Sequence, residues 1–207
     1  MKATTHLLLL LAVLLMGWLV SCDNSRTLDY TVTCQLDSTL HRDSATLLVL
    51  EQDYKQLRQC GVARIQGGEV TFTGQTDGPR VALLRFDGDS AAPFYFVLDT
   101  GLTQIKLGAT TWDVKGNEQN LAYQQFMNAR QAILQERLGL WQRYLKMKAD
   151  SSLKRRDEAA MVERDSVLND SLFNLMVDRM NGDDMVSVIM RQRFAGDLPP
   201  QYASKLK

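Results

Sequence analysis

The sequence predicts an α+β protein in which an antiparallel β-sandwich or partly closed barrel is followed by an antiparallel helical hairpin and a short third helix. Two observations support this fold class. Apolar and polar residues alternate in short segments up to about residue 116, and apolar residues recur at helical spacing from there on. We therefore expect a leader at 1–21, a tether at 22–28, a β module at 29–116, a helical region at 117–196 and a C-terminal tail at 197–207.

The first strand is expected in residues 29–36, where Tyr30, Val32, Cys34 and Leu36 alternate with polar residues. This period of two is typical of a strand with one buried face. Short segments rich in β-branched and aromatic residues, separated by Gly, Asp and Pro, predict further strands at 45–52, 61–66, 68–75, 80–86, 94–98, 103–107 and 111–114.

Asn117 is a suitable N-cap for the first long helix, in which apolar residues recur between residues 121 and 147. Residues 150–152 offer a break and a new cap before a second stripe at 161–176, and residues 185–194 predict a third, shorter helix. We expect the two long helices to fold back on each other, so that each buries the apolar stripe of the other. The stripe of the first helix includes Phe126, Ile133, Leu134, Leu138, Trp141 and Leu145.

Composition excludes several functional classes. The 207 residues are 45% hydrophobic, and Lys plus Arg and Asp plus Glu both total 24, so the chain has no basic excess for binding nucleic acid. His6 and His41 are its only histidines, which argues against a His-rich metal site or a Ser-His-Asp relay. We expect neither enzymatic activity nor a metal.

The amino terminus has the pattern of a secretory leader. Lys2 precedes an apolar run from Leu7 to Val20, which ends at a small residue and Cys22. As a helix, the run would extend about 21 Å, which is less than the hydrocarbon core of about 30 Å. It is therefore too short to serve well as a permanent membrane span.

Leu19-Val20-Ser21-Cys22 resembles the lipobox of bacterial lipoproteins. The resemblance implies a lipoprotein signal peptide cleaved before Cys22, a diacylglycerol on the Cys22 thiol and an N-acyl chain such as palmitate, with no other cofactor. Two or three acyl chains anchor a protein stably where one does not. We therefore expect a lipid-anchored protein of the cell envelope of a Gram-negative bacterium, with the outer membrane favoured. The alternative is an uncleaved signal anchor with an incidental cysteine.

Asp99-Thr100-Gly101 has the form of the catalytic turn of an aspartic protease. Such a protease needs two carboxylates that share a proton, and no second Asp-Thr-Gly or Asp-Ser-Gly occurs. Leu102 also stands where Ser, Thr or Ala is usual. We interpret these residues as a hairpin loop in which Gly101 supplies a positive φ and Asp99 binds nearby backbone amides.

Cys34 and Cys60 are the other two cysteines, and an oxidising compartment allows a disulfide between them. It would close a loop of about 26 residues, worth about 3–4 kcal/mol in the chain-entropy model. The position of Cys34 on the apolar face of its strand favours the alternative, two free thiols that pack as small hydrophobic groups.

Three further features have a structural and a functional interpretation. Residues 87–90 resemble the start of a calcium loop but lack its later glycine and terminal glutamate, which favours a plain loop. Residues 154–156 are basic, and a solvated face is favoured over a docking site for lipid headgroups or an acidic partner. The seven methionines of the helical region are interpreted as core rather than as an adaptable binding surface.

A longer pattern combines a strand that ends in Gly, an aromatic strand that ends near Gly, a Val-x-Gly turn, an amide, and a helix with Tyr and Phe. Its members are Val70, Phe72, Gly74, Phe96, Leu98, Gly101, Ile105, Val114, Gly116, Asn120, Tyr123 and Phe126. In this pattern the segment from about Leu28 to Phe126 resembles the domain of unknown function (DUF) 4369 family. The resemblance implies an N-terminal β module of Bacteroidota lipoproteins, which is commonly followed by helices and a thioredoxin-like domain.

The sequence departs from that family in one important respect. No cysteine follows Cys60, so the redox-active cysteine pair of a thioredoxin-like domain is absent. The leading hypothesis is a non-enzymatic envelope lipoprotein that acts as a membrane-tethered binding or assembly module with a protein partner. The alternative is an accessory partner of a separate thioredoxin-like thiol-disulfide oxidoreductase. A small ligand bound in the β module is a third hypothesis, which requires an apolar pocket there.

Overall fold

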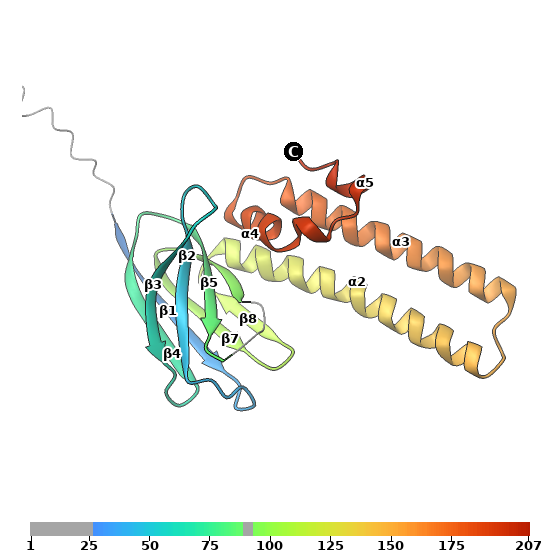
Figure 1. Ribbon diagram of the computed structural model, residues 1–207, viewed down its shortest axis with the longest axis horizontal. Coiled ribbons are helices and arrows are strands. Elements are labelled where there is room, and N and C mark those ends of the chain that lie inside the picture. The colour runs from blue at the N-terminus through green and yellow to red at the C-terminus, as the bar shows by residue number, and fades with distance from the viewer. Residues whose placement is uncertain (1–26, 89–92) are drawn as a thin grey trace, which may run out of the picture.

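The computed structural model describes residues 27–88 and 93–207 (Figure 1). The predicted leader and Cys22 lie outside the described residues. The elements are β1 Leu28–Leu36, β2 Ser44–Leu50, β3 Leu57–Arg64, β4 Glu69–Thr76, β5 Arg80–Phe86, β6 Phe94–Leu98, β7 Gly101–Leu107, β8 Trp112–Lys115, α2 Glu118–Ala149, α3 Arg155–Met180, α4 Met185–Phe194, η2 Ala195–Asp197 and α5 Pro200–Ala203.

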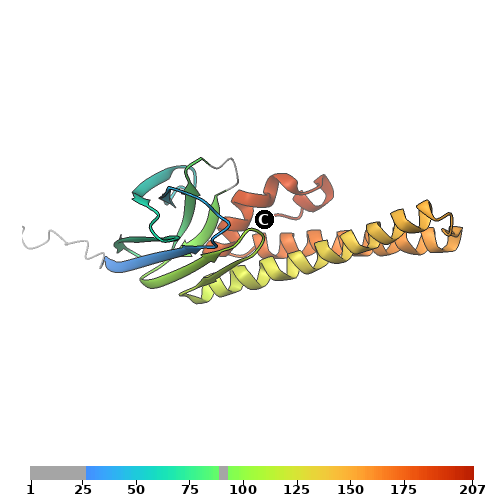
Figure 2. The same cartoon turned by 90° about the horizontal axis from the view of Figure 1, so that it is seen from below.

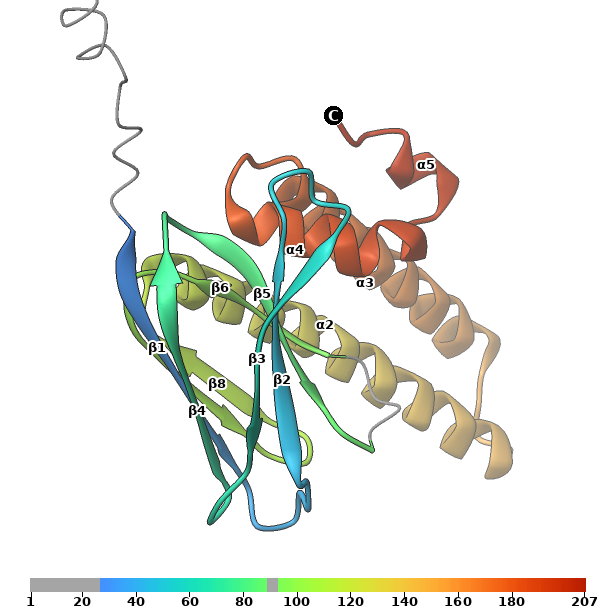
Figure 3. The same cartoon turned by 60° about the vertical axis from the view of Figure 1, so that its left-hand side comes forward.

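The strands form two four-stranded sheets that pack face to face (Figure 3). Sheet A has the order β4-β1-β7-β8, and sheet B has the order β3-β2-β5-β6. The predicted α+β class with a β-sandwich is confirmed, and the sheets do not close into a barrel. One pair differs from the expected antiparallel arrangement: β1 and β7 are parallel, with Val32 opposite Thr103. The chain crosses from sheet B to sheet A after β6, and this crossing brings β7 beside β1 in the same direction.

The space between the sheets is filled by the residues that alternation predicted. Tyr30, Val32 and Cys34 of β1 are buried there and pack with side chains of the opposite sheet. The polar residues between them lie on the other face of sheet A. Each strand of this sheet therefore has one buried face, as its period of two indicates.

The central strands β2 and β5 of sheet B are buried on both faces because helices cover their outer side, whereas the edge strand β3 is largely exposed. Ala82 and Leu84 of β5 face the other sheet, whereas Val81 packs with residues of the helices. Helix α4 contacts β5 and β6 directly. The continuous apolar runs of β2 and β5 are typical of strands with two buried faces, so the fold has three layers: sheet A, sheet B and helices.

Helix α2 is attached to the edge strands of both sheets by side-chain amides. The Val97 N–H of β6 donates to Asn120 Oδ1 at 2.7 Å, and Asn120 Nδ2 donates to the Val97 carbonyl at 2.8 Å. One turn later, Gln124 Oε1 accepts from the Val114 N–H of β8 at 3.2 Å. These amides take the place of a neighbouring strand, and they satisfy backbone groups that an edge would otherwise leave unpaired.

The start of α2 is fixed by its cap and by the glycine before it. Asn117 accepts from the Asn120 N–H at 2.8 Å, as an N-cap does, and this confirms the predicted cap. Gly116 has a φ of 141°, and a Cβ there would meet the Leu102 carbonyl oxygen at 2.6 Å. Only glycine fits this close approach of the chain to β7.

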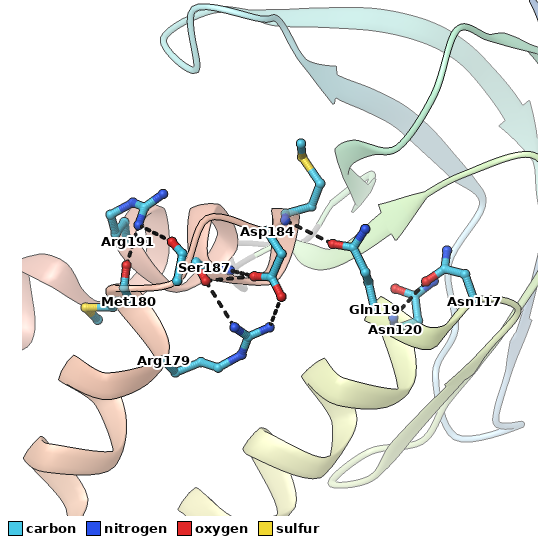
Figure 4. Close-up of polar contacts among 10 residues, drawn as sticks. Asn117, Gln119, Asn120, Arg179, Met180, Asp184, Ser187 and Arg191 are labelled. Carbon is cyan, nitrogen blue, oxygen red and sulfur yellow. Dashed lines mark hydrogen bonds and ion pairs between the residues drawn. The ribbon is translucent and has the colours of Figure 1, made fainter. Parts of the chain in front are cut away.

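A polar corner joins α2, α3 and α4 (Figure 4). Arg179 at the end of α3 donates to Asp184 at 2.7 Å and to the Ser187 hydroxyl at 3.0 Å. Asp184 caps α4 by accepting from the Ser187 N–H at 2.9 Å, and Gln119 of α2 accepts from the Met185 N–H at 2.9 Å. Partial burial raises the pKa of Asp184, but the hydrogen bonds from Arg179 and Ser187 outweigh it and lower that pKa to about 2.

Beyond the sheets, α2 and α3 continue as a long hairpin (Figures 1 and 2). The predicted break at residues 150–152 and the predicted end of α3 at Asn181 are both confirmed. The expected cap of α3 is wrong. Lys154 is its N-cap, without a side-chain hydrogen bond, and the Ser152 hydroxyl instead donates to the Met147 carbonyl at the end of α2.

The residues predicted to form a C-terminal tail are partly folded. The segment of η2 and α5 packs against α3, with Leu198 between the two elements and Tyr202 of α5 buried in the helical core. The ring of Tyr202 lies 4.9 Å from that of Phe173. This contact covers the side of α3 that faces away from α2. The sequence predicted no neighbour for that side of the helix.

Replacing Asn120 by alanine tests the attachment of α2 to the sandwich. We expect the free energy of unfolding to fall by about 1–3 kcal/mol, because the variant leaves the N–H of buried Val97 without a partner. The Val97 carbonyl loses one of its two side-chain donors and keeps Asn117 Nδ2 at 3.1 Å. The measurement is urea-induced unfolding of the full chain. Gln125→Ala is the matched control, since Gln125 is exposed on the same helix. Equal stability of the two variants would contradict the proposed role.

Candidate functional site

Asp99 lies in the short connection between β6 and β7. The Thr100 N–H donates to its carboxylate at 2.8 Å, and Gly101 has a φ of 83°. The interpretation of these residues as a turn is confirmed. The expectation of a hairpin is wrong, because β6 belongs to sheet B and β7 to sheet A.

Cys34 and Cys60 are both free thiols in the structure. Cys34 of β1 is fully buried, and this burial raises the pKa of its thiol to about 12. Cys60 of β3 is partly exposed, and partial burial also raises the pKa of its thiol. Neither thiol has the lowered pKa of a reactive cysteine.

The two thiols are expected to react at very different rates. We predict that iodoacetamide modifies Cys60 in the native protein at slightly alkaline pH, whereas Cys34 reacts only after denaturation. Peptide mapping by mass spectrometry measures both. A peptide pair linked through Cys34 and Cys60 in the native protein, lighter than the reduced pair by two hydrogen atoms, would contradict this expectation.

The other candidate motifs lie in or near loops. Asp87 accepts a hydrogen bond from the Ser44 hydroxyl, and Asp89 and Ser90 lie outside the described residues. No group of three His, Cys, Asp or Glu side chains that could hold a metal occurs within residues 27–88 and 93–207. In the same part of the chain, no helix has both the length and the apolar character that crossing a membrane requires.

Methionines of the helical region contribute to the core, as predicted. Met176, Met180 and Met190 are buried in the helical core. The remaining members of the set are partly buried, namely Met127, Met147, Met161 and Met185. The fully buried methionines thus act as core, whereas the partly buried ones remain accessible in part.

Among the described residues, several exposed apolar side chains gather on the distal hairpin. Leu138, Trp141 and Leu145 of α2 share one helix face by their spacing, and their exposed fractions are 51%, 44% and 61%. Val162 of α3 is 60% exposed and lines the same groove as Trp141. We call these four residues the hairpin surface. The expectation that α3 would bury this part of the stripe is wrong.

Polar pairs between the two helices explain why the stripe is turned outward. Arg137 donates to Asp165 at 2.9 Å, and Arg164 donates to Glu136 at 2.9 Å. Hydrogen bonds from Arg137 outweigh partial burial and lower the pKa of Asp165. Leu140 and Leu168 are the buried apolar residues of this part of the hairpin. Charged pairs on the flanks thus fix a helix rotation that leaves the hairpin surface open to solvent.

The end of the hairpin is strongly basic. Between residues 143 and 156 there are six basic residues and one acidic residue, Asp150. None of the six forms an ion pair in the described part of the chain. We call this segment the basic tip. It consists of residues 143–156, with the basic residues Arg143, Lys146, Lys148, Lys154, Arg155 and Arg156.

The basic tip and the hairpin surface together can bind another surface non-covalently. Apolar side chains exposed over two helices supply contact area, and the unpaired cations supply long-range attraction for an acidic partner. Leu145 joins the two features, since it belongs to the hairpin surface and lies within the basic tip. This combination is typical of a docking surface.

Comparison with known proteins identifies the class of the β module. The model of the family described as domain of unknown function DUF4369 matches residues 30–123. The predicted resemblance is therefore confirmed for the sandwich and the first turns of α2. No match to the chain was found among curated proteins, and none among solved structures.

The family pattern describes the framework of the fold. Phe96, Ile105 and Val114 are buried between the sheets, and Gly116 and Asn120 form the attachment of α2 described above. The hairpin surface lies outside the matched residues. Sequence reasoning missed it because the spacing of Leu138, Trp141 and Leu145 is the same whether a helix face is buried or exposed.

Proposed function

We propose that this protein is a lipid-anchored lipoprotein of the Gram-negative cell envelope that works, without catalysing a reaction, as a membrane-tethered binding or assembly module. The observation that carries the proposal is the exposed hairpin surface beside the basic tip. In this proposal the sandwich sits at the membrane, and the hairpin presents the docking surface at a distance from it.

The lipid anchor is supported by the sequence of the leader. Four residues ending at Cys22 fit the lipobox, and β1 begins at Leu28, six residues after the cysteine. Six residues span about 20 Å when fully extended. The anchor would therefore hold the sandwich close to the lipid headgroups.

The partner that fits the hairpin is a protein that presents an acidic surface with an apolar patch. Charge complementarity to the basic tip argues for acidic groups, and Leu145 and Trp141 argue for an apolar centre. The 32 residues of α2 extend about 48 Å. Because α2 starts at the sandwich and the tip lies at its other end, this length favours a protein partner over the anchoring membrane itself.

Replacing Cys22 by alanine tests the anchor. We expect the variant to incorporate no labelled fatty acid, because alanine has no thiol to carry the diacylglycerol. Cys60→Ala is the control and should be labelled to the same extent as the unchanged protein. Mass spectrometry of the native amino-terminal peptide gives a direct reading, and a peptide without lipid or with the leader attached would refute the anchor.

A photo-crosslinking amino acid at exposed Gln142, introduced in intact cells, tests the docking surface. We expect one protein with an acidic surface to be captured. Its yield should drop by about five-fold or more in Leu145→Gln and in Arg156→Gln, as for residues central to an interface. The measurement is the yield of the crosslinked band, identified by mass spectrometry.

Leu102→Gln is the matched control, since Leu102 is exposed to a similar degree, 49% against 61%, but lies on β7. It should leave the yield unchanged. A crosslinked band that consists of two copies of this chain, capture of lipid alone, or equal yields in all variants would each contradict the proposed partner.

A further inference from the structure

A second concave site lies at the end of the sandwich, where both sheets meet α2 and α4. It is a pocket of about 440 Å³. Small-molecule sites in proteins have volumes of about 300–1,000 Å³. We call it the junction pocket, and it is lined by Leu36, Leu40, Arg42, Phe86, Pro93, Phe94, Leu107, Gly108, Ala109, Thr110, Thr111, Trp112, Met127 and Arg193.

One wall of the junction pocket is a packed set of aromatic rings. The ring of Trp112 lies 5.2 Å from that of Phe94 in an edge arrangement and stacks on Tyr123 at 5.5 Å. Phe94 and Trp112 are each only partly buried. Rings already held by their neighbours lose little freedom when a ligand packs on them, and they favour an apolar or aromatic body.

Besides the lining residue Arg42, two guanidinium groups from the helices lie beside this wall. Arg193 of α4 is 5.3 Å from the ring centre of Tyr95, and it donates to the Tyr123 hydroxyl. Arg130, one turn beyond Met127 on α2, is 4.8 Å from the ring centre of Phe194, and so is Arg193. The two cations are thus packed around the same ring.

The positive charge of these arginines is not matched by a carboxylate in contact. Neither Arg130 nor Arg193 forms an ion pair among the described residues, and the buried Nε of Arg130 has no hydrogen-bond partner. Burial and the charge of Arg193 lower the pKa of Arg130, and they outweigh the opposing effect of the nearby Asp197 carboxylate. Two like charges held together in a partly apolar setting attract an anion more strongly than exposed charges do.

We propose that the junction pocket binds a small molecule that carries an oxyanion, a carboxylate or a phosphate, on an apolar or aromatic body. Arg193 contacts the anion, since the planar guanidinium matches carboxylate and phosphate oxygens. Arg130 adds to the positive potential from behind. The body of the ligand packs on Trp112 and Phe94. This site is separate from the hairpin surface, so the small-molecule ligand and the protein partner are independent proposals.

Isothermal titration calorimetry of the full-length protein with three matched compounds tests the proposal. The compounds are 4-phenylbutyrate, 4-phenylbutyl phosphate and the uncharged 4-phenylbutyramide. We expect at least one anion to bind at least about ten-fold more tightly than the amide, as charge-assisted hydrogen bonds allow. Which of the two anions binds more tightly identifies the head group.

Variants locate the binding. Arg193→Gln should reduce the affinity for the anion to that for the amide, and Arg85→Gln, an exposed arginine of β5, should leave it unchanged. Because Arg193 also contacts Tyr123 and two rings, thermal unfolding must show that its variant is folded. Ala109→Trp, which keeps every arginine and fills the pocket, is the second variant and should abolish binding of all three compounds.

Three results would overturn the proposal. The first is equal affinity for the anions and the amide, and the second is full-strength binding in folded Arg193→Gln or Ala109→Trp protein. The third is the absence of saturable binding of either anion at millimolar concentration. None of these results depends on the lipid anchor or on the hairpin partner.

Discussion

The position of the helical half relative to the sandwich depends on the carboxamide of Asn120. Its two hydrogen bonds to Val97, at 2.7 and 2.8 Å, pair with the edge of sheet B as a backbone would. Gln124 makes the corresponding contact with sheet A. Because α2 is held at both sheet edges, it has little freedom to rotate relative to the sandwich. Helix α4 is therefore held against β5, and the mouth of the junction pocket has a fixed shape. The hairpin then extends from a rigid base.

Much of the β module was predictable because one physical requirement determines it. Residues such as Val32 and Cys34 alternate with polar neighbours, since one face of each strand is buried and the other is not. The parallel pairing of β1 with β7 was not predictable in this way, because alternation reports which face is buried and not which strand lies beside it. The burial of β5 on both faces can be read in the sequence, because residues Val81 to Leu84 form a continuous apolar run. Such a run indicates a third layer.

The helical half shows the limit of the same reasoning. Asn117 and Asn181 were predicted as helix ends from local chemistry, which does not depend on tertiary contacts. The burial of Trp141 was predicted from periodicity and proved wrong, because ion pairs such as Arg137 with Asp165 set the rotation of α2. The junction pocket was beyond the reach of the sequence, since Arg193, Trp112 and Met127 come from three elements that only the fold brings together. Ion pairs between helices, and side chains that converge on one pocket, depend on how the elements pack, so local sequence does not predict them.

The central place of β1 in its sheet has a mechanical consequence. This strand begins six residues after Cys22, and it is hydrogen-bonded to β4 on one side and to β7 on the other. A pull along the chain from its amino-terminal end would load both rows of bonds in shear, whereas an edge strand pulled in the same direction would be held by one row only. Tension between a fixed amino terminus and a load on the helices would then act on a strand that is hydrogen-bonded on both sides.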